Sequence, residues 1–519
     1  MCIAPDNSVC ESAKPNTTDW KSIKWHKVNR HVTSLQERIY RASKSNDKKK
    51  VRDLQRQLMR SKSALIKAVD RVTRVNKGKS TQGIDGFKAT NDKARGELVD
   101  MLRSSNMKFH RPKPAFRKYI PKKNGKKRSL GIPTIKDRVY QEIIRMAMEP
   151  EWEAKFEPTS YGFRPGRRQH DAIRRIHYNI ESGKWCWVME GDFKSCFDTL
   201  SHDFILEQIH GFPHFNLVKR FLKAGYVDNG AFHNTYEGTP QGGLLSPLLA
   251  NIALHGMEKA LGITYRYRTR IKNDEIYEFT ESMGDYRVVR YADDFLVFAQ
   301  SKDEIMEAFE LLKPYLDERG LILSEDKTHI THISEGFDFL GFNCRRYNDG
   351  VSRTKPSKDS IRRFVEKIKD IFKSCHGHNI NILIKRLNPV IRGTANYWRH
   401  VVSKEIFSKL DHYLWNKSFR FLRRLHPNKG KRWIKDRYFP FYFDGKHYGN
   451  WVLTDPKTDD NLVKMNWTPI RRYIMIKHDY SPYDHDKKDY FANLRPIFVC
   501  FTKIKVCLSR MYGNIHVRF

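Results

Sequence analysis

The sequence predicts an α+β fold, in which strand hairpins and helices occupy separate stretches of the chain. Two hairpin signals indicate the β part. Residues 119–133 place two strands around an Asn-Gly turn, and residues 288–298 place two buried strands around an Ala-Asp-Asp turn. The α part follows from apolar residues at helical spacing, which recur before residue 75 and again from residue 361.

The N-terminal part, residues 1–79, is predicted to be a basic helical hairpin. Apolar residues recur at helical spacing from Val28 to Ile39 and from Val51 to Val72, and a polar Asn-Asp-Lys-Lys-Lys run separates the two sets. The same spacing is also typical of an ordinary helix pair packed on a core, so it does not by itself indicate a nucleic-acid partner.

The charge balance points to a polyanionic partner. The 519-residue chain has 97 Lys and Arg against 59 Asp and Glu, a formal net charge of +38. A basic protein of membrane surfaces is the competing interpretation. No apolar run approaches the ~20 residues that span a bilayer, so we expect no membrane partner.

The eight cysteines include no Cys-x-x-Cys pair, which argues against a zinc site. Scattered thiols in a chain of this size favour a reducing compartment. The N-terminus has no secretory apolar region. We therefore expect a cytoplasmic protein of a bacterium, and an origin in an organelle stays open.

Three aspartates are the strongest chemical signal. Asp293 and Asp294 are adjacent between apolar strands, and at ~4 Å and an effective dielectric of ~20 their charges would repel by about 4 kcal/mol unless a cation lay between them. Asp192 follows the apolar run 185–189. Three such carboxylates could hold two Mg²⁺ ions for in-line phosphoryl transfer, one activating the attacking hydroxyl and one stabilising the leaving pyrophosphate. The alternative is a solvated Asp-Asp turn.

These motifs resemble a known family. Tyr-Ala-Asp-Asp at 291–294, after Gly-Thr-Pro-Gln-Gly-Gly at 238–243, is similar to the reverse transcriptases. In detail the blocks resemble the multidomain proteins encoded by group II introns, which act as reverse transcriptase and splicing maturase. The resemblance covers roughly residues 20–440 and includes Thr-Gln-Gly-Ile-Asp-Gly at 81–86. The Cys/His-containing endonuclease module of many relatives has no counterpart in this sequence.

The resemblance implies a right-hand polymerase with an attached maturase domain. Fingers and palm would occupy residues 80–345, with an antiparallel palm sheet, and a helical thumb or maturase (X) domain would occupy 355–440. Residues 441–519 would form a basic DNA-binding region. Within the palm, residues 336–342 resemble the primer grip, an apolar strand that supports the primer 3′ end.

The resemblance also assigns the catalytic residues. Asp192, Asp293 and Asp294, with the adjacent Phe193, would hold two Mg²⁺ ions. Lys327, which follows a predicted helix at 305–316, would protonate the pyrophosphate, and general acid help of this kind is typically worth 10²–10⁴-fold in rate. Exposed lysines are common, so the alternative for this residue is an ordinary surface lysine.

Four residues are implied to contact the incoming nucleotide. Lys122 and Arg128 would bind its phosphates from the hairpin at 119–133, where Arg offers a planar fork and Lys a point charge. Phe197 would exclude a ribose 2′-OH, and Gln241 would touch the nucleotide and the template strand. The alternatives are a solvated basic hairpin and an ordinary core phenylalanine.

The RNA contacts are expected in two places. Arg164 lies in Tyr-Gly-Phe-Arg-Pro-Gly at 161–166, which resembles a block that meets the template, although a surface arginine in a Gly/Pro loop is the alternative. Residues 415–437 interleave basic and aromatic residues, as an RNA groove requires. An amphipathic helix bundle with a solvated basic face has the same pattern. The candidate RNA contacts there are Arg420, Arg423, Arg424 and Lys429.

The resulting hypothesis is an enzyme that extends a primer 3′-OH with deoxynucleoside triphosphates on an RNA template. The template would be group II intron RNA or another RNA, and the protein would also assist intron splicing and retrohoming into a DNA target. The alternatives are an RNA-binding splicing factor whose polymerase is incidental, and a domesticated host enzyme, for example in phage defence. The sequence does not decide between a monomer and a homodimer.

Overall fold

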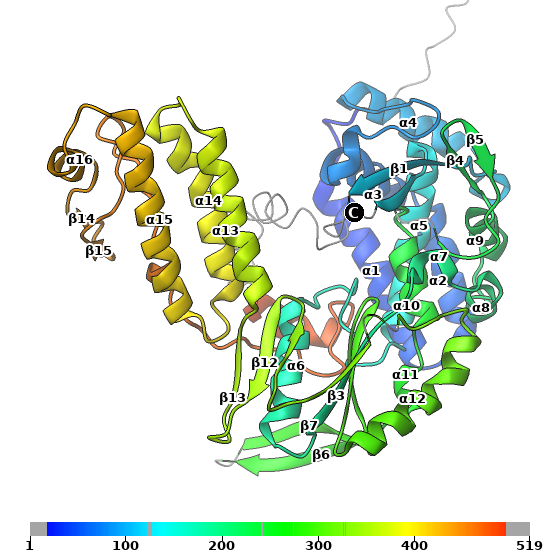
Figure 1. Ribbon diagram of the computed structural model, residues 1–519. Coiled ribbons are helices and arrows are strands. Elements are labelled where there is room, and N and C mark those ends of the chain that lie inside the picture. The colour runs from blue at the N-terminus through cyan, green and yellow to red at the C-terminus, as the bar shows by residue number, and fades with distance from the viewer. Residues whose placement is uncertain are drawn as a thin grey trace, which may run out of the picture. The chain divides into compact units, whose positions relative to one another are not determined.

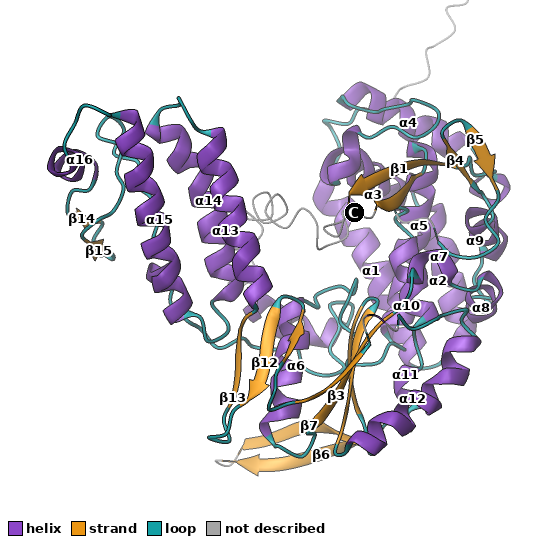
Figure 2. Ribbon diagram, in the orientation of Figure 1, coloured by secondary structure: helices purple, strands orange, loops and turns teal. Residues whose placement is uncertain are grey.

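The computed structural model describes residues 18–121, 127–239, 242–272, 275–324, 326 and 328–494. The chain divides into two compact units, which we describe separately. Unit 1 comprises the described residues of Met1–Ala154 and Ile205–Leu248. Unit 2 comprises those of Lys155–Phe204 and Leu249–Val517. Helices and strands alternate in both, so the mixed α and β composition predicted from the sequence is confirmed (Figure 2).

The N-terminal helices of unit 1 pack against one long helix. The first predicted helix is present, whereas the second is divided at Ser61, whose hydroxyl accepts a hydrogen bond from the backbone N–H of Ala64 and so starts a new helix. The helix-promoting apolar spacing alone did not reveal this cap. The helices of this part are α1 Trp25–Lys44, α2 Lys48–Arg60, α3 Lys62–Asp70, α4 Asp92–Ser104 and α5 Ile135–Glu153.

A four-stranded sheet completes unit 1. The predicted hairpin is formed by β1 (Ala115–Pro121) and β2 (Lys127–Ile132), which pair antiparallel. On its other edge β1 pairs in parallel with β4 (Tyr226–Asp228), and β4 continues into β5 (Ala231–His233). Helix α9 (Phe215–Leu222) precedes β4.

The central sheet of unit 2 is antiparallel and has the strand order β10-β3-β9-β8. Helix α6 (Gln169–Glu181) packs on β8, and α12 (Lys302–Asp317) packs on β9 and β3 (Figure 1). Apolar side chains of the strands and of α6 join one core. The strands are β3 Trp187–Asp192, β8 Arg287–Tyr291, β9 Asp294–Ala299 and β10 His329–His332.

A second sheet of unit 2 leads into four helices. Residues 336–342 were expected to form one strand, but Leu340 and Gly341 have positive φ and turn the chain, so β11 (Phe337–Phe339) and β12 (Phe342–Arg346) form a hairpin instead. Strand β13 (Ser352–Pro356) pairs with β12. The predicted helical region follows as α13 Lys358–Ser374, α14 Ile380–Trp398, α15 Lys404–Leu425 and α16 Lys431–Tyr438, with α13 and α14 side by side (Figure 1).

The remaining elements are short, apart from a two-stranded ribbon. In the described part of the chain no helix is long and apolar enough to cross a membrane. The ribbon consists of β6 Thr264–Lys272 and β7 Glu275–Met283. The short elements include α7 Cys196–Thr199, α8 His202–Gln208, α10 Ser246–Ala253, α11 Met257–Ala260, β14 Tyr442–Phe443 and β15 Tyr448–Gly449.

Candidate active site

The turn between β8 and β9 carries the adjacent carboxylates. Tyr291 pairs with Asp294 across the hairpin, so Ala292 and Asp293 form a two-residue turn. Ala292 has φ +59°, and Asp293 is not among the residues with positive φ. Positive φ at the first central position alone is the pattern of a type II′ turn, which normally takes glycine there. An alanine in this region costs about 1–2 kcal/mol, so the surrounding structure must hold the turn in place.

The third carboxylate lies opposite this turn. In the antiparallel pairing of β3 with β9, Asp192 is the direct partner of Asp294. Directly opposed residues lie on one face of a sheet, with Cα atoms ~4.5–5.5 Å apart. Asp192 and Asp293 are half-buried and Asp294 is exposed. The three aspartates predicted from the sequence are therefore brought to one end of the unit 2 sheet.

A glycine on β3 makes this pairing possible. A Cβ on Gly191 would lie 2.2 Å from the ring of its partner Phe295, which is fully buried and stacks on Phe193 with ring centroids 5.1 Å apart. Phe193 was expected to contribute to metal binding. Its ring is part of this core, so only its main-chain oxygen could serve as a ligand.

A segment upstream of the sheet supports the turn from below. Ser160 forms a bridge with Arg290, and the backbone N–H of Tyr161 donates to the Arg290 carbonyl at 2.9 Å. A Cβ on Gly162 would lie 2.2 Å from the backbone nitrogen of Ala292. The glycine in this block is thus needed for close backbone contact with the catalytic turn.

Arg290 connects the same elements through its side chain. Only 1% of Arg290 is exposed, and its Nη1 donates to Asn251 Oδ1 at 3.1 Å and to the Ala292 carbonyl at 3.2 Å. Asn251 in turn donates to the Gly162 carbonyl at 2.8 Å. Burial lowers the pKa of Arg290. Sequence analysis did not single out Arg290 or Asn251, although an arginine within an apolar strand was an available signal.

Arg164 belongs to this support and not to a template surface. It is 7% exposed, and its Nη1 donates to the carbonyls of Glu157 at 2.6 Å and Ser160 at 2.8 Å. The guanidinium also lies over the ring of Phe156. Because these groups surround its charge, direct contact with a template is not favoured, and the residue instead holds the 157–162 loop under the turn.

The donor set fits a divalent cation in part. Burial, followed by the negative charge of Asp293, raises the pKa of the buried Cys196 thiol, and Asp192 acts in the same direction. Both carboxylates therefore lie close to one point beside the sheet. Among the described residues, however, no group of three or more His, Cys, Asp or Glu side chains is placed to hold a metal. Mg²⁺ commonly takes one or two carboxylates and completes its shell with substrate phosphates and water, so a closed protein cage is not required.

The other predicted nucleotide contacts are described only in part. Phe197 is buried on α7, with its ring edge toward Phe163 at a centroid distance of 6.3 Å. Arg128 is exposed on β2, opposite Ile120. Lys122, Gln241 and Lys327 lie outside the described residues, so their roles stay predictions.

The glycine-rich loop around position 241 is anchored within unit 1. A Cβ on Gly242 would lie 2.5 Å from the carbonyl oxygen of Gly131, on the same strand as Arg128. The backbone N–H of Leu244 donates to Gln141 Oε1 on α5 at 2.9 Å. The loop therefore packs against the strand that carries the predicted phosphate-binding arginine.

The predicted RNA contacts on α15 and after it differ from Arg164, because all are exposed: Arg420, Arg423, Arg424 and Lys429. Trp433 on α16 receives two cations, with Lys429 Nζ 5.4 Å and the guanidinium carbon of Arg437 5.3 Å from its ring centroid. Charges for a backbone and a ring for stacking are thus available on one surface.

Comparison with known proteins places these elements in a family. The family model for reverse transcriptase (RNA-dependent DNA polymerase) matches residues 120–344, that for the N-terminal domain of reverse transcriptase matches 20–102, and that for the group II intron, maturase-specific domain matches 361–439. Telomerase from Candida albicans is a structural match at a TM-score of 0.36 and 14% identity, covering 64% of this chain and 62% of that one, which is too low to support an argument.

Two curated relatives agree with these matches. Group II intron-encoded protein LtrA of Lactococcus lactis subsp. cremoris is 35% identical over 361 residues, which is 56% of this chain and 59% of LtrA. Protein YkfC of Escherichia coli K12 is 37% identical over 300 residues, which is 53% of this chain and 79% of YkfC. The alignment thus spans less than two thirds of LtrA. The chain belongs to the family of group II intron-encoded reverse transcriptases and maturases.

Proposed function

We propose that the protein is an RNA-directed DNA polymerase that copies group II intron RNA into cDNA and binds that RNA to assist splicing and retrohoming. The pairing of Asp192 with Asp294, with Asp293 in the adjoining turn, is the observation that carries the proposal. It lies in a segment that the reverse transcriptase family model matches. The further partners would be a DNA primer or target and deoxynucleoside triphosphates.

In this proposal the chain's own residues position the reacting groups. Asp192, Asp293 and Asp294 would hold two Mg²⁺ ions, which when bound lower the pKa of the attacking primer hydroxyl and stabilise the leaving pyrophosphate. Gly162, Asn251 and Arg290 keep the turn in its strained conformation. Lys122 and Arg128 would bind the triphosphate, Phe197 and Gln241 would select and orient the nucleotide, and Lys327 would protonate the pyrophosphate.

We further propose the domain roles that the resemblance implies. Residues 80–345 would act as fingers and palm of a right-hand polymerase, 355–440 as thumb and maturase domain, and 441–519 as a DNA-binding region. The support is the exposed cationic surface of α15 and the following turn, which lies within the maturase-specific match. Phosphate contacts of this kind supply affinity and position without reading sequence.

The substitution Asp293→Ala tests the polymerase assignment. Primer extension on an RNA template should fall by at least ~10³-fold, since removing a charge-stabilising group from an active site has effects of this size. Binding of the same RNA should persist, because Asp293 contributes no positive charge. Unchanged synthesis by a correctly folded variant would contradict the assignment.

A further inference from the structure

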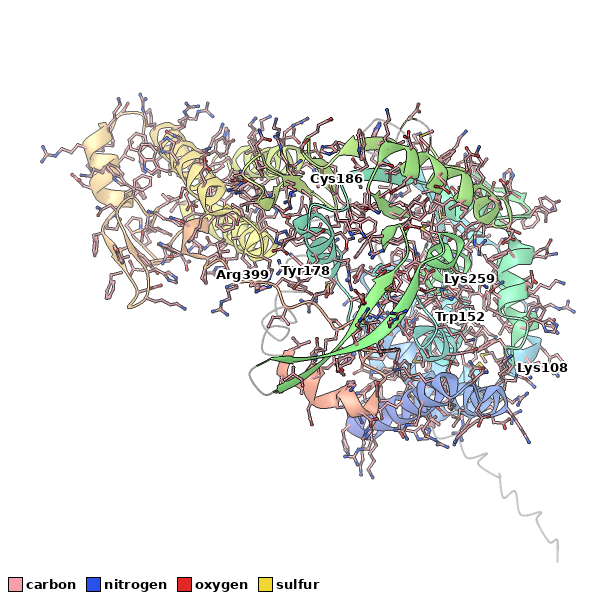
Figure 3. The ribbon with its side chains drawn as sticks, turned by 90° about the horizontal axis from the view of Figure 1, so that it is seen from below. Lys108, Trp152, Tyr178, Cys186, Lys259 and Arg399 are labelled. Atoms are coloured by element: carbon pink, nitrogen blue, oxygen red, sulfur yellow. The ribbon has the colours of Figure 1, made fainter. Side chains whose placement is uncertain are left out.

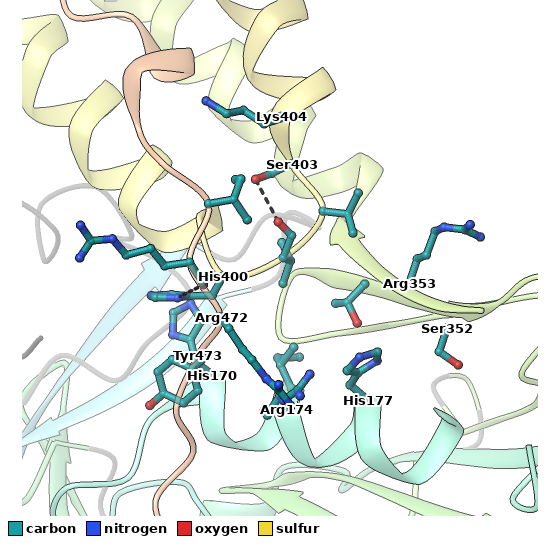
Figure 4. Close-up of a pocket in the computed structure, with 16 residues that line it drawn as sticks. His170, Arg174, His177, Ser352, Arg353, His400, Ser403, Lys404, Arg472 and Tyr473 are labelled. Carbon is teal, nitrogen blue, oxygen red and sulfur yellow. Dashed lines mark hydrogen bonds between the residues drawn. The ribbon is translucent and has the colours of Figure 1, made fainter. Parts of the chain in front are cut away.

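Unit 2 contains a basic cavity that shares no residue with the catalytic turn. Its volume is about 450 Å³, within the size range of small-molecule sites. Four separate segments line it: α6, β13, the loop between α14 and α15, and residues 470–473 (Figure 4). Its sixteen lining residues include five Lys or Arg and three His, and no Asp or Glu.

Three of the lining cations already have protein partners nearby. Arg353 donates to the Asp349 carboxylate at 2.6 Å. Lys404 donates to the backbone carbonyls of Asn466 and Thr468. Arg471 is exposed, and its guanidinium is directed away from the centre of the cavity, so we do not use it. The remaining two, Arg174 and Arg472, converge on the same point (Figure 4).

Arg174 and Arg472 meet at the hydroxyl of Tyr178, one turn along α6. The Arg174 Nη2 donates to this hydroxyl at 3.3 Å, and hydrogen bonds from both guanidinium groups lower the pKa of Tyr178 against the effect of its burial. Figure 3 marks Tyr178 on α6 and Arg399, whose carbonyl accepts the backbone N–H of Arg471 and so fixes the 470–473 segment. Two like charges thus share one neutral partner.

The cluster contains unused donors. Among the described residues, no hydrogen-bond partner is available to the buried Nε of Arg174 or to the buried Nδ1 of His177. Burial and the positive charges of Arg174 and Arg472 lower the pKa of His177, while Glu181 acts in the opposite direction. Buried polar groups are normally hydrogen-bonded, and two guanidinium groups this close repel each other. An oxyanion between them would satisfy both conditions.

The rest of the cavity is not charged. Ile173, Val401, Val402 and Ile470 provide an apolar wall opposite the cations. A free inorganic anion would use only the charged part. A ligand with a phosphate group and an apolar ring would use both, which is the composition of a nucleotide.

We propose that Arg174, His177 and Arg472 form a phosphate-binding site for a nucleotide, separate from the polymerase site. The two guanidinium groups would donate to the phosphate oxygens, as arginine forks do in charge-assisted pairs, and the apolar wall would contact the base. The nucleotide is either one residue of an RNA strand or a free mononucleotide. The site does not depend on nucleotidyl transfer, so it stands or falls independently of the proposed polymerase.

The test uses the full chain with Arg174→Gln and Arg472→Gln, alone and combined. Binding of a 20-nucleotide oligo(A) RNA is followed by fluorescence anisotropy between 50 and 300 mM KCl, and binding of AMP by calorimetry. The double variant should bind the RNA about tenfold more weakly, and its salt slope should be smaller by about 1.4, since each lost phosphate contact on a single strand removes ~0.7. The double variant Arg266→Gln/Lys369→Gln removes the same charge from exposed positions in unit 2 and is the matched control.

The outcomes separate the two sources of nucleotide. Loss of both RNA and AMP binding would show that the site accepts free nucleotides, and loss of RNA binding alone would show that it holds a strand. RNA affinity equal to that of the control double variant, or an equal loss of polyglutamate binding, would overturn the proposal. Arg472 is exposed, so its single variant keeps the test valid if Arg174→Gln disturbs α6. Primer extension by all variants should equal that of the wild type.

Discussion

The catalytic turn and the basic cavity are both polar sites in unit 2, but they are built in opposite ways. At the turn the supporting groups are buried and saturated with internal hydrogen bonds, as in the Arg290–Asn251–Gly162 connection. At the cavity the groups are half-buried or exposed, and two buried donors are unused. A saturated site holds a fixed geometry for chemistry, whereas an unsaturated one is suited to gaining a ligand.

The difference also concerns sequence distance. The turn and its opposing strand lie in two short motifs, and a supporting block at 157–162 completes them. The cavity collects residues from α6 and from the segment 470–473, roughly three hundred positions apart in the chain. Substitutions near the turn should therefore change stability and catalysis together, while substitutions at the cavity should change binding alone.

The largest effect is expected for Gly162→Ala. Its Cβ would lie 2.2 Å from the backbone nitrogen of Ala292, and backbone cannot move aside as a side-chain end can. We expect destabilisation of about 3 kcal/mol, as for severe overpacking, and a loss of primer extension of at least ~10²-fold. Chemical denaturation and single-turnover extension measure the two quantities.

Gly430→Ala is the control for this substitution, because a Cβ at Gly430 has no heavy atom within 4 Å and its φ is negative. It should leave both quantities close to wild type. If Gly162→Ala behaved in the same way, the turn would not depend on its supporting block, and the contrast between the two sites would fail.

A smaller effect, on binding alone, is expected at the exposed cationic surface of α15. Replacing Arg423 and Arg424 together by Gln should weaken RNA binding about tenfold at 100 mM salt and reduce the salt slope by about 1.4. The melting temperature should not change, because surface substitutions of this kind are usually worth under ~0.5 kcal/mol. Anisotropy and thermal melting test this, with Arg266→Gln/Lys369→Gln as the control. A marked loss of stability with unchanged affinity would assign these arginines to the fold.

A pH-dependent effect is expected beside the catalytic strand. Burial, then the charge of Asp338, raises the pKa of Glu190 from its ordinary value of 4.5 to about 7. Between pH 4.5 and 7 the folded state therefore binds more protons than the unfolded state, so this group destabilises the fold progressively as pH rises through that window. Glu190→Gln should raise the melting temperature by roughly 2–4 °C at pH 8.5 and change it little at pH 4.5.

Glu335 is an exposed carboxylate in the same unit, and Glu335→Gln should shift the melting temperature equally little at both pH values. If the Glu190 variant gave the same shift at both pH values, or gained stability only in acid, the buried carboxylate would not be protonated near neutrality as the structure indicates.

The smallest effect is expected for Ala292→Gly, which removes the penalty for positive φ at the turn. The gain of about 1–2 kcal/mol is offset by the greater flexibility of glycine in the unfolded chain, about 0.5–1 kcal/mol, so we expect a net increase of roughly 0.5 kcal/mol in unfolding free energy. Chemical denaturation measures it. A clear loss of stability would show that the Ala292 methyl group makes contacts that outweigh the strain.

Sequence reasoning predicted the chemistry of the turn and missed its support. Asp192, Asp293 and Asp294 could be found because each lies at the end of a short apolar run, where local pattern indicates both strand and chemistry. The helices α12 and α13 could be predicted for the same reason. The division of the second N-terminal helix at Ser61 depends on one side-chain cap, which periodicity does not reveal.

The support and the cavity could not be predicted because they depend on which distant segments meet. Arg164 was expected at the template, yet its position beneath the turn follows from carbonyl partners at Glu157 and Ser160 that only the folded loop presents. The basic pair Arg471-Arg472 was visible in the sequence, but its approach to Arg174 arises from long-range packing. Short motifs therefore predicted chemistry, and tertiary contacts determined which charges serve as ligand-binding groups.

The most direct test of the central assignment is a count of Mn²⁺ ions by electron paramagnetic resonance, with template–primer and a non-hydrolysable deoxynucleotide bound. If the aspartates at the end of the sheet hold the metal ions, wild-type protein should bind two, and Asp192→Asn should lose at least one. Asp198→Asn, an exposed neighbouring carboxylate, should bind as wild type does. Equal numbers of ions, held with equal affinity, in the wild type and in Asp192→Asn would contradict the assignment of these carboxylates as the metal site of a polymerase.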